Sequence, residues 1–494
     1  MADDELAVLD ATASAELVRA GEVPALELVH AARERIEALD PQLNAVVRTR
    51  FDEATAEAHA ADEQAGADEA ASPFRGVPFL LKDLGALVAG EPVAFGSAVL
   101  RDSPVRWPAT SYTAEAFARA GLVVLGRTAT PEFGTTITTE PRAFGPTRNP
   151  WDPTRSAGGS SGGAAAAVAS GMVPAAHASD GGGSIRIPAS CCGLVGLKPS
   201  RGRVSAGPLV GESWAGSTTD GVLTRTVRDA AALLDLLTTP MPGDPYNAAP
   251  PLRPYAEEVG ADPGRLRVGL HLGPGRQDAP EPDGEVVAAV RAAGELLAGL
   301  GHHVEEDAPA ALTDPGHARN FLSVVVADVA LTVRQLEGAL EREIADDELE
   351  PRNATYRRAG LALRAPDYLA ARAWLGQWSR RMAAWWAPRE LGGEAHDLLV
   401  LPVIATLPPE IGWYTAGGDA EEGSRIASVL QYTGQFNTTG QPALSLPLGV
   451  SQGGVPIGVQ LVAAAGREDL LVRVARQIEL AAPWSDRRPA VFAS

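Results

Sequence analysis

The sequence predicts an α/β protein with a parallel or mixed sheet. Short apolar runs alternate along the chain with stretches of helical periodicity, which is the pattern of buried strands packed between helices. The 494 residues are 45% hydrophobic and 21% charged, a composition typical of a globular protein rather than a fibre or a disordered tail. The length suggests roughly three domains, but it is also compatible with one large α/β unit.

Residues 1–70 are expected to be helical and to carry no obvious functional site. Asp40-Pro41 is expected to end one helix in which apolar residues recur at helical spacing, namely Leu28, Ala32, Ile36 and Leu39. A second helix, rich in Ala, Glu and Asp, is predicted over residues 51–69 and should be largely solvated.

The strands are expected from residue 74 onward, with helices between them. Strands are predicted at 77–81, 122–125, 266–270, 398–404 and 457–462, and helices at 112–120 and 285–300. Residues 240–263 are rich in proline and polar residues, so we expect a linker or excursion there. Residues 321–386, with clustered Trp and Arg, are predicted to be mainly helical.

Charge and cysteine usage limit the functional classes and the compartment. The formal net charge of −20 argues against a broad basic face for nucleic acid, and the apolar runs fall short of the about 18 residues that a membrane helix needs. The first ten residues, MADDELAVLD, carry acids where a secretory signal has positive charge. Cys191 and Cys192 are adjacent, so they cannot supply a disulfide framework or spaced zinc ligands, although a vicinal disulfide stays open. We expect buried thiols in a reducing cytoplasm.

Lysine is scarce, which draws attention to two positions. Lys82 and Lys198 are the only lysines among 42 basic residues. A buried ammonium can lose its proton and act as a base, whereas a guanidinium effectively cannot. Codon bias would explain the scarcity equally well, so the count only nominates these two residues.

Residues 156–205 concentrate Gly and Ser around one Ala-rich helix that Ser161 or Gly162 can cap. The run Gly181-Gly182-Gly183 ends at Ser184, and three successive glycines permit positive φ and expose consecutive backbone N–H groups, as an anion cradle requires. No Gly-Lys-Ser/Thr follows and the glycine spacing does not fit a dinucleotide fingerprint. A tight turn without chemistry is the alternative; we favour an oxyanion hole with Ser184 as the nucleophile.

A nucleophilic serine needs a proton acceptor. His177 is nearby in sequence, but Ser184 lacks the Gly-x-Ser-x-Gly elbow, and a histidine in this position is more often a packing or surface residue. Lys82 is the better candidate, because the apolar residues around it in FLLKDL should desolvate the amine and lower its pKa toward the working pH.

Several linked motifs resemble the amidase signature family of Ser-Ser-Lys hydrolases. They are GGSSGG at 158–163, SDGGGSIRIPA at 179–189, GLKPSRGRVS at 196–205, KDL at 82–84, FNTTGQPALSLPLG at 436–449 and PIGVQLVAAAGRED at 456–469. The resemblance covers nearly the whole chain. It implies a single domain with a central mixed sheet covered by helices on both faces. Its expected parts are N-terminal helices (1–70), the signature core (71–239), a linker and mainly helical substrate-side region (240–395), and a C-terminal sheet segment (396–494).

The resemblance also implies residue roles. It assigns the nucleophile to Ser184, the bridging cis-peptide serine to Ser160 and the base to Lys82. The oxyanion donors would be the backbone N–H groups of Gly181, Gly182, Gly183 and Ser184. Supporting roles fall to Ser161, Asp180 and Arg186, and Lys198 matches a structural turn position. Two residues depart from the family pattern, Gly181 before the final Gly-Gly and His177 where a small residue is common.

The implied reaction needs neither metal nor organic cofactor. The motif wording looks most like a bacterial subgroup that hydrolyses cyclic dimers of 6-aminohexanoate, so we expect a homodimeric hydrolase of a small or medium non-peptide amide, linear or cyclic. Possible pocket residues are Phe321, Val325, Trp413 and Asn437, with core packing as the alternative for each. A glutaminase subunit of a tRNA-dependent amidotransferase and a carbamate or ester hydrolase are the other hypotheses, and a catalytically silent binding protein is a weaker one.

Overall fold

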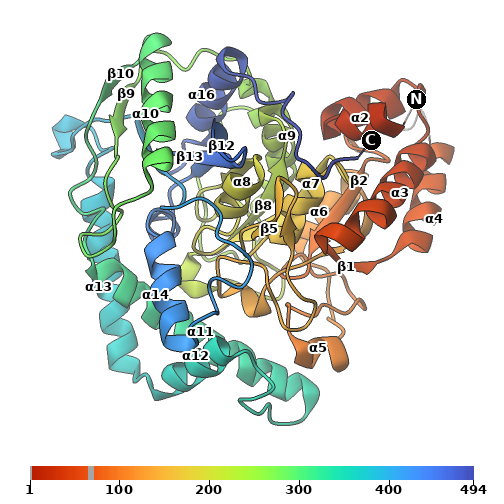
Figure 1. Ribbon diagram of the computed structural model, residues 1–494, viewed down its shortest axis with the longest axis horizontal. Coiled ribbons are helices and arrows are strands. Elements are labelled where there is room, and N and C mark those ends of the chain that lie inside the picture. Colours follow the sequence, from red (N-terminus) through yellow and green to blue (C-terminus); the bar gives the residue numbers. More distant parts are fainter. Residues whose placement is uncertain (1–2, 65–71, 494) are drawn as a thin grey trace.

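Figure 1 shows the computed structural model, which describes residues 3–64 and 72–493. One large sheet runs through the molecule, with eleven strands in the order β1-β3-β2-β6-β8-β7-β12-β13-β11-β9-β10. Parallel pairs at β2–β3, β2–β6, β9–β10 and β9–β11 combine with antiparallel pairs elsewhere, so the sheet is mixed. The predicted α/β class is confirmed.

The strands of this sheet are β1 (Val46–Thr49), β2 (Pro78–Lys82), β3 (Val123–Thr128), β6 (Ala175–Asp180), β7 (Val195–Lys198), β8 (Thr219–Thr224), β9 (Arg267–Leu270), β10 (His303–Glu305), β11 (Leu398–Pro402), β12 (Ala443–Val450) and β13 (Pro456–Ala463). A separate two-stranded ribbon joins β4 (Arg148–Asn149) and β5 (Asp152–Ser156).

The N-terminal half holds the helices α1 (Asp3–Val8), α2 (Ala11–Arg19), α3 (Ala25–Leu43), α4 (Phe51–Glu63), α5 (Ala98–Asp102), α6 (Tyr112–Arg119), α7 (Gly162–Ala169), α8 (Arg186–Cys192) and α9 (Val227–Leu237). The C-terminal half holds α10 (Gly284–Gly299), α11 (Gly316–Leu340), α12 (Pro351–Ala362), α13 (Ala365–Ala383), α14 (Asp419–Val429), α15 (Gly434–Thr439) and α16 (Glu468–Ala481). No helix among the described residues is both long enough and apolar enough to cross a bilayer.

Strand β2 shows why its sequence is continuously apolar. Leu80 packs into a core with helices α3, α7 and α8, whereas Phe79 and Leu81 pack on the other side of the sheet with α6 and α9. Successive side chains of a strand point to opposite faces, so a strand covered on both faces has no position for a solvated residue. The same burial carries through to Lys82, at the end of the strand.

Helix α3 ends later in the sequence than predicted. Helix α3 does not stop at Asp40-Pro41, because Pro41 is accommodated in its last turn and the chain leaves the helix only at Asn44, which has positive φ. The Asp40 carboxylate then accepts the N–H groups of Ala45 and Val46, so the acidic residue stabilises the exit after the helix. Helix α4 ends at Glu63, and most of the predicted continuation lies outside the described residues.

Several strands were not predicted from the sequence. Strand β6 has the sequence AAHASD and β8 has TDGVLT, and neither contains a bounded apolar run. They lie side by side with β2 in the middle of the N-terminal half of the sheet, where Ala, Ser and Gly let the neighbouring helices approach closely. Their small side chains therefore reflect close packing.

Between the two halves, residues 240–263 contain one short 3₁₀ turn, Tyr255–Glu258, and no strand. Helix α11 packs against both α12 and α13, on the side that also carries α14 (Figure 1). Helix α11 reaches the Gly-rich loop through Phe321, as described below.

Candidate active site

The site begins at the end of β2, where Lys82 is fully buried. The Lys82 Nζ atom donates to Ser160 Oγ at 2.7 Å and to Ser179 Oγ at 3.0 Å. Ser160 follows Gly159 through a cis peptide bond and is itself buried. The amine therefore meets the serine that the family resemblance names as its relay.

Burial of the Lys82 amine lowers its pKa to about 7, and the negative charges of Asp220 and Asp180 oppose that shift. The ordinary pKa of a lysine is about 10.4. Near neutral pH a substantial fraction of this side chain is therefore the free amine, which can accept a proton from a hydroxyl.

The serine-rich turn is fixed against β6. Ser161 stands at the N-cap position of α7, but its hydroxyl does not cap the helix. Its Oγ donates to Ser179 O at 3.3 Å and accepts from Ser179 N at 3.4 Å. These bonds tie the Ser160 turn to the strand that leads directly into the Gly-rich loop, and they agree with the supporting role expected of Ser161.

The Gly-rich loop joins the end of β6 to α8 and holds Ser184 two residues before Arg186. The Gly183 N–H donates to Asp180 Oδ1 at 2.7 Å, so it is directed at a carboxylate within the protein. This corrects the expectation that Gly183 donates to an oxyanion. The backbone N–H groups of Gly181, Gly182 and Ser184 remain the proposed donors.

Asp180 and Arg186 form a buried brace under this loop. Arg186 Nε and Nη2 donate to the two Asp180 carboxylate oxygens at 3.0 and 2.9 Å, and both side chains are fully buried. Burial alone would raise the pKa of Asp180, but the adjacent Arg186 guanidinium holds it well below its usual range. The remaining guanidinium N–H groups donate to Thr433 O, Gln460 Oε1 and Asn437 Oδ1.

Asn437 belongs to this brace. Its Nδ2 donates to Asp180 O at 3.1 Å, Asp180 Oδ1 at 2.8 Å and Ser217 O at 3.0 Å, and its Oδ1 accepts from Arg186. Both ends of the side-chain amide are engaged, so Asn437 supports the loop, and its expected place beside the pocket stays a prediction. Thr433 acts beside it, donating from Oγ1 to Gly182 O at 2.6 Å.

Gly183 is the position in the loop where a side chain has least room. Its φ is +135°, and a Cβ added there would lie 2.4 Å from Thr433 Oγ1 and 2.7 Å from Ile187 Cδ1. We expect Gly183→Ala to reduce the free energy of unfolding by roughly 1–3 kcal/mol, and to reduce turnover because the loop must shift.

Chemical denaturation and steady-state kinetics would check this expectation. Gly338→Ala is the matched control, since it lies in helix α11 and an added Cβ meets no atom within 4 Å. That change should stabilise the protein slightly. Equal stability of Gly183→Ala and the wild type would contradict the steric argument.

An aromatic cluster lies over the loop. The Phe321 ring contacts Trp214 edge-on at 6.1 Å and stacks on His317 at 5.7 Å, and a Cβ on Gly182 would lie 3.8 Å from Phe321. Burial lowers the pKa of His317 to about 3, so its ring is neutral and does not compete as an acid. Val325 follows one helical turn after Phe321 and is buried. The expected pocket residues Phe321 and Val325 therefore share one face of α11, and Phe321 borders the loop.

The other expected residues lie in different surroundings. Trp413 is 37% exposed, and its ring contacts Tyr414 and Arg425 outside this aromatic cluster. Lys198 is buried, burial lowers its pKa to about 7, and its Nζ donates to Pro199 O at 2.7 Å, which fits the structural role expected of it. Cys191 and Cys192 are free buried thiols, and burial raises the pKa of Cys191 to about 12.

Four residues of the site were not singled out from the sequence, namely Ser179, Trp214, Thr433 and Gln460. Ser179 and Gln460 fall inside motifs that resemble the family, so the motifs themselves could have nominated them. Trp214 stands in a loop with positive φ and no periodic pattern, and only its three-dimensional contacts identify it.

A possible metal-binding group lies elsewhere in the described chain. Asp307, Glu394 and His396 come together near the β9–β10 edge, whereas Lys82 is on β2, third from the other edge of the sheet. His396 Nε2 is already 3.2 Å from both Asp307 Oδ2 and Glu305 Oε1, so neighbouring carboxylates within the protein already occupy this ring nitrogen.

Comparison with known proteins identifies a matching family. The family model described as Amidase matches residues 27–472. The chain belongs to the amidase family. It is 42% identical over 98% of its length to 6-aminohexanoate-cyclic-dimer hydrolases from Pseudomonas sp. (strain NK87) and Paenarthrobacter ureafaciens, covering 97% of each. A solved structure of 6-aminohexanoate cyclic dimer hydrolase complexed with substrate superposes with a TM-score of 0.92 at 40% identity, over 99% of this chain and all of that one.

Membership of the amidase family makes this chain a hydrolase acting on carbon–nitrogen bonds. It also confirms the recognition made from the linked motifs and the expectation of an amidase-type domain with a mixed sheet.

Proposed function

We propose that this protein hydrolyses a cyclic, non-peptide amide of the 6-aminohexanoate type, with Ser184 as nucleophile, Ser160 as relay and Lys82 as base. The observation that carries the mechanism is the 2.7 Å contact between the buried Lys82 amine and Ser160 Oγ. The substrate class rests on the similarity to cyclic-dimer hydrolases over nearly the full length of the chain.

In the first half-reaction, neutral Lys82 accepts the Ser160 proton while Ser160 accepts the proton of Ser184. The Ser184 oxygen bonds to the amide carbon, and the carbonyl oxygen becomes an oxyanion facing the N–H groups of Gly181, Gly182 and Ser184. Collapse of this intermediate breaks the carbon–nitrogen bond, and Ser160 returns a proton to the departing nitrogen.

In the second half-reaction, water adds to the acyl carbon and gives up a proton along the same relay. As the bond to Ser184 breaks, the relay returns that proton to Ser184 Oγ. In a cyclic amide the departing amine stays tethered to the acyl chain. The site must therefore hold both ends of an opened ring while water enters. Phe321, which borders the Gly-rich loop, offers an apolar surface for the methylene chains of such a substrate.

A substrate panel tests this proposal. We expect the cyclic dimer of 6-aminohexanoate to give the highest kcat/KM, ahead of the linear dimer, an aryl acetamide, a carbamate, an ester and glutamine. Mass spectrometry should show one product that is heavier than the cyclic substrate by one water.

The outcome also separates the alternatives. Preference for glutamine, together with obligate co-purification with a second subunit, would indicate the amidotransferase subunit, and preference for the carbamate or ester would indicate those hydrolases. Ser184→Ala should abolish turnover of every substrate in the panel. Assembly as a homodimer in the cytoplasm is part of the same proposal, and light scattering of the purified protein tests the dimer.

A further inference from the structure

His177 is the departure from the family pattern that the reaction above does not use. It lies in β6, next to β2, and its side chain is fully buried. Its Nδ1 accepts the backbone N–H of Lys82 at 3.3 Å. The other ring nitrogen, Nε2, lies 3.3 Å from Asp220 Oδ1, in contact with the carboxylate but without hydrogen-bond geometry. The histidine therefore stands between the backbone of the proposed base and a carboxylate.

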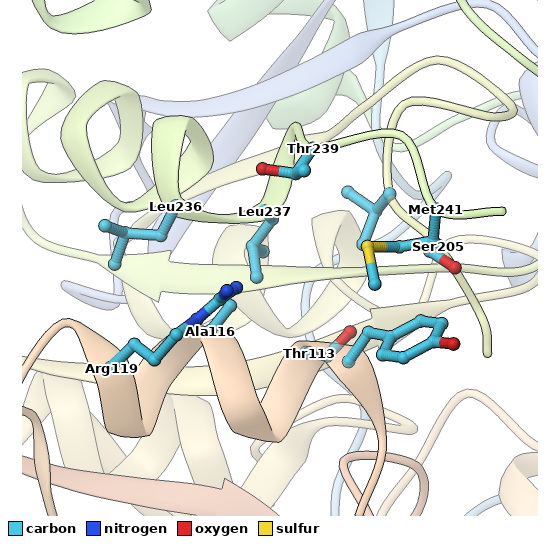
Figure 2. A pocket seen from close by; sticks show the side chains of 10 residues that line it. Thr113, Ala116, Arg119, Ser205, Leu236, Leu237, Thr239 and Met241 are labelled. Carbon is cyan, nitrogen blue, oxygen red and sulfur yellow. The ribbon is translucent and has the colours of Figure 1, made fainter. Parts of the chain in front are cut away.

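Both oxygens of Asp220 contact a neighbouring side chain. Its second oxygen, Oδ2, accepts a hydrogen bond from Thr113 Oγ1 at 3.1 Å. Thr113 also lines the small hollow in Figure 2, between α6 and the chain that follows α9. On β8, Asp220 pairs directly with Ser179, whose hydroxyl contacts the Lys82 amine. A Cβ on Gly85 would lie 3.3 Å from Asp220 Oδ1, so the turn that leaves Lys82 also packs on this carboxylate.

The other charges around Lys82 have their own partners. Asp180 is paired with Arg186, and Asp83 accepts the N–H groups of Ala94 and Gly96. Arg127 donates to Lys82 O and lies 3.6 Å from Glu91. Within the part of the chain that the structure describes, no Arg or Lys side chain forms an ion pair with Asp220. Of the two carboxylates whose charge raises the pKa of Lys82, Asp220 and Asp180, only Asp180 is paired with a guanidinium.

We propose that Asp220, held by Thr113 and packed against His177, is the positioning residue that sets the electrostatic environment of the Lys82 amine, an inference that rests on the function proposed above. A fixed negative charge favours the protonated amine and so counteracts part of the effect of burial. Asp220 is the largest of the opposing charges on the pKa of Lys82, which stays at about 7. The charge thus keeps the amine a strong enough base to deprotonate a serine hydroxyl.

The test is the pH dependence of Ser184 activation, measured both with the hydrolysed amide and with a fluorophosphonate that phosphonylates activated serines. In Asp220→Asn the acidic limb of both profiles should move down by about one pH unit, and the rate on the plateau should fall. Asp220→Ser removes the same charge with a smaller side chain and should give the same shift, so a folding failure of one variant leaves the other decisive.

Two comparisons separate a charge effect from a structural one. Asp220→Glu keeps the charge, and its limb should stay near that of the wild type. A merely structural role would make Glu and Asn alike. Asp235→Asn is the matched control on α9, where the carboxylate accepts backbone N–H groups of Tyr255 and Ala256, and its limb should not move.

The result also distinguishes this inference from the proposed function. If Lys82→Met kept full turnover, the assignment of the base would fail and this inference with it. If Lys82→Met were inactive while the limbs of the folded Asp220→Asn and Asp220→Ser variants stayed in place, the role of Asp220 alone would be overturned.

Discussion

Replacing Lys82 with methionine is expected to lower kcat/KM by roughly 10³- to 10⁵-fold, because the variant keeps the volume of the side chain and loses the proton acceptor. In the wild type, kcat/KM should rise with pH through about 7, since burial lowers the pKa of Lys82 to that value and only the neutral amine is a base. Initial rates on the cyclic amide from pH 5 to 9 would measure both effects.

Lys198→Met is the matched control for this variant. Lys198 is also fully buried, and burial lowers its pKa to about 7, but its amine donates to Pro199 O. Its replacement should change kcat/KM by less than about tenfold, the range of a general effect on packing. If the two methionine variants lost activity equally, the special role of Lys82 would be refuted.

The Lys82→Met variant should be more resistant to unfolding than the wild type near neutral pH. The pKa of Lys82 is lower in the folded state than in the unfolded chain, so between about 7 and 10.4 the unfolded state binds the additional proton. Wild-type stability should therefore rise with pH across that window and carry a penalty below it. Methionine removes this penalty, so a higher thermal midpoint of Lys82→Met at pH 6 is the expected sign that the site trades stability for basicity.

The sequence predicted the parts of the fold that depend on strong local signals. Continuous apolar runs predicted β2, β3 and β11, because a strand buried on both faces is apolar at every position. Helical periodicity predicted α6 and α10, because a helix buried along one stripe has apolar residues at regular spacing. It missed β6 and β8, whose Ala, Ser and Gly residues are selected by packing between distant elements. The prediction that α3 ends at Asp40-Pro41 was wrong, because the last turn of the helix accommodates the proline.

At the site, the three proposed catalytic side chains were named from motifs, but their supports were only partly foreseen. The sequence cannot show that the Gly183 N–H is taken by Asp180, or that Asn437 closes the brace, because both depend on contacts across long separations in the chain. His177 was noted as a departure, and its contacts with Lys82 and Asp220 became visible only with β6 and β8 in place.

The brace under the Gly-rich loop should be the strongest single contribution to stability near the site. Arg186→Met leaves the buried Asp180 carboxylate without its cation, and breaking a buried pair typically costs about 3–5 kcal/mol. We therefore expect a loss of that size in the free energy of unfolding at pH 7, measured by urea denaturation, together with lower kcat. Arg186→Lys should recover only part of it, because an ammonium keeps the charge but lacks the fork that serves Asp180, Gln460 and Asn437 at once.

The pH dependence of that loss identifies its cause. In the wild type the pKa of Asp180 is held below its unfolded value, so its stabilising contribution is present above about pH 4 and is lost only as the pH falls further. Without Arg186, burial dominates and raises that pKa, so Arg186→Met should be more stable at pH 5 than at pH 7.

Asp180→Asn combined with Arg186→Met should then cost less free energy of unfolding than the sum of the single changes. Arg364→Met, which removes an exposed pair with Asp367, should leave stability nearly unchanged at both pH values. A loss for Arg186→Met no larger than that of the control would mean that the loop is held by its backbone geometry, with the ion pair contributing little.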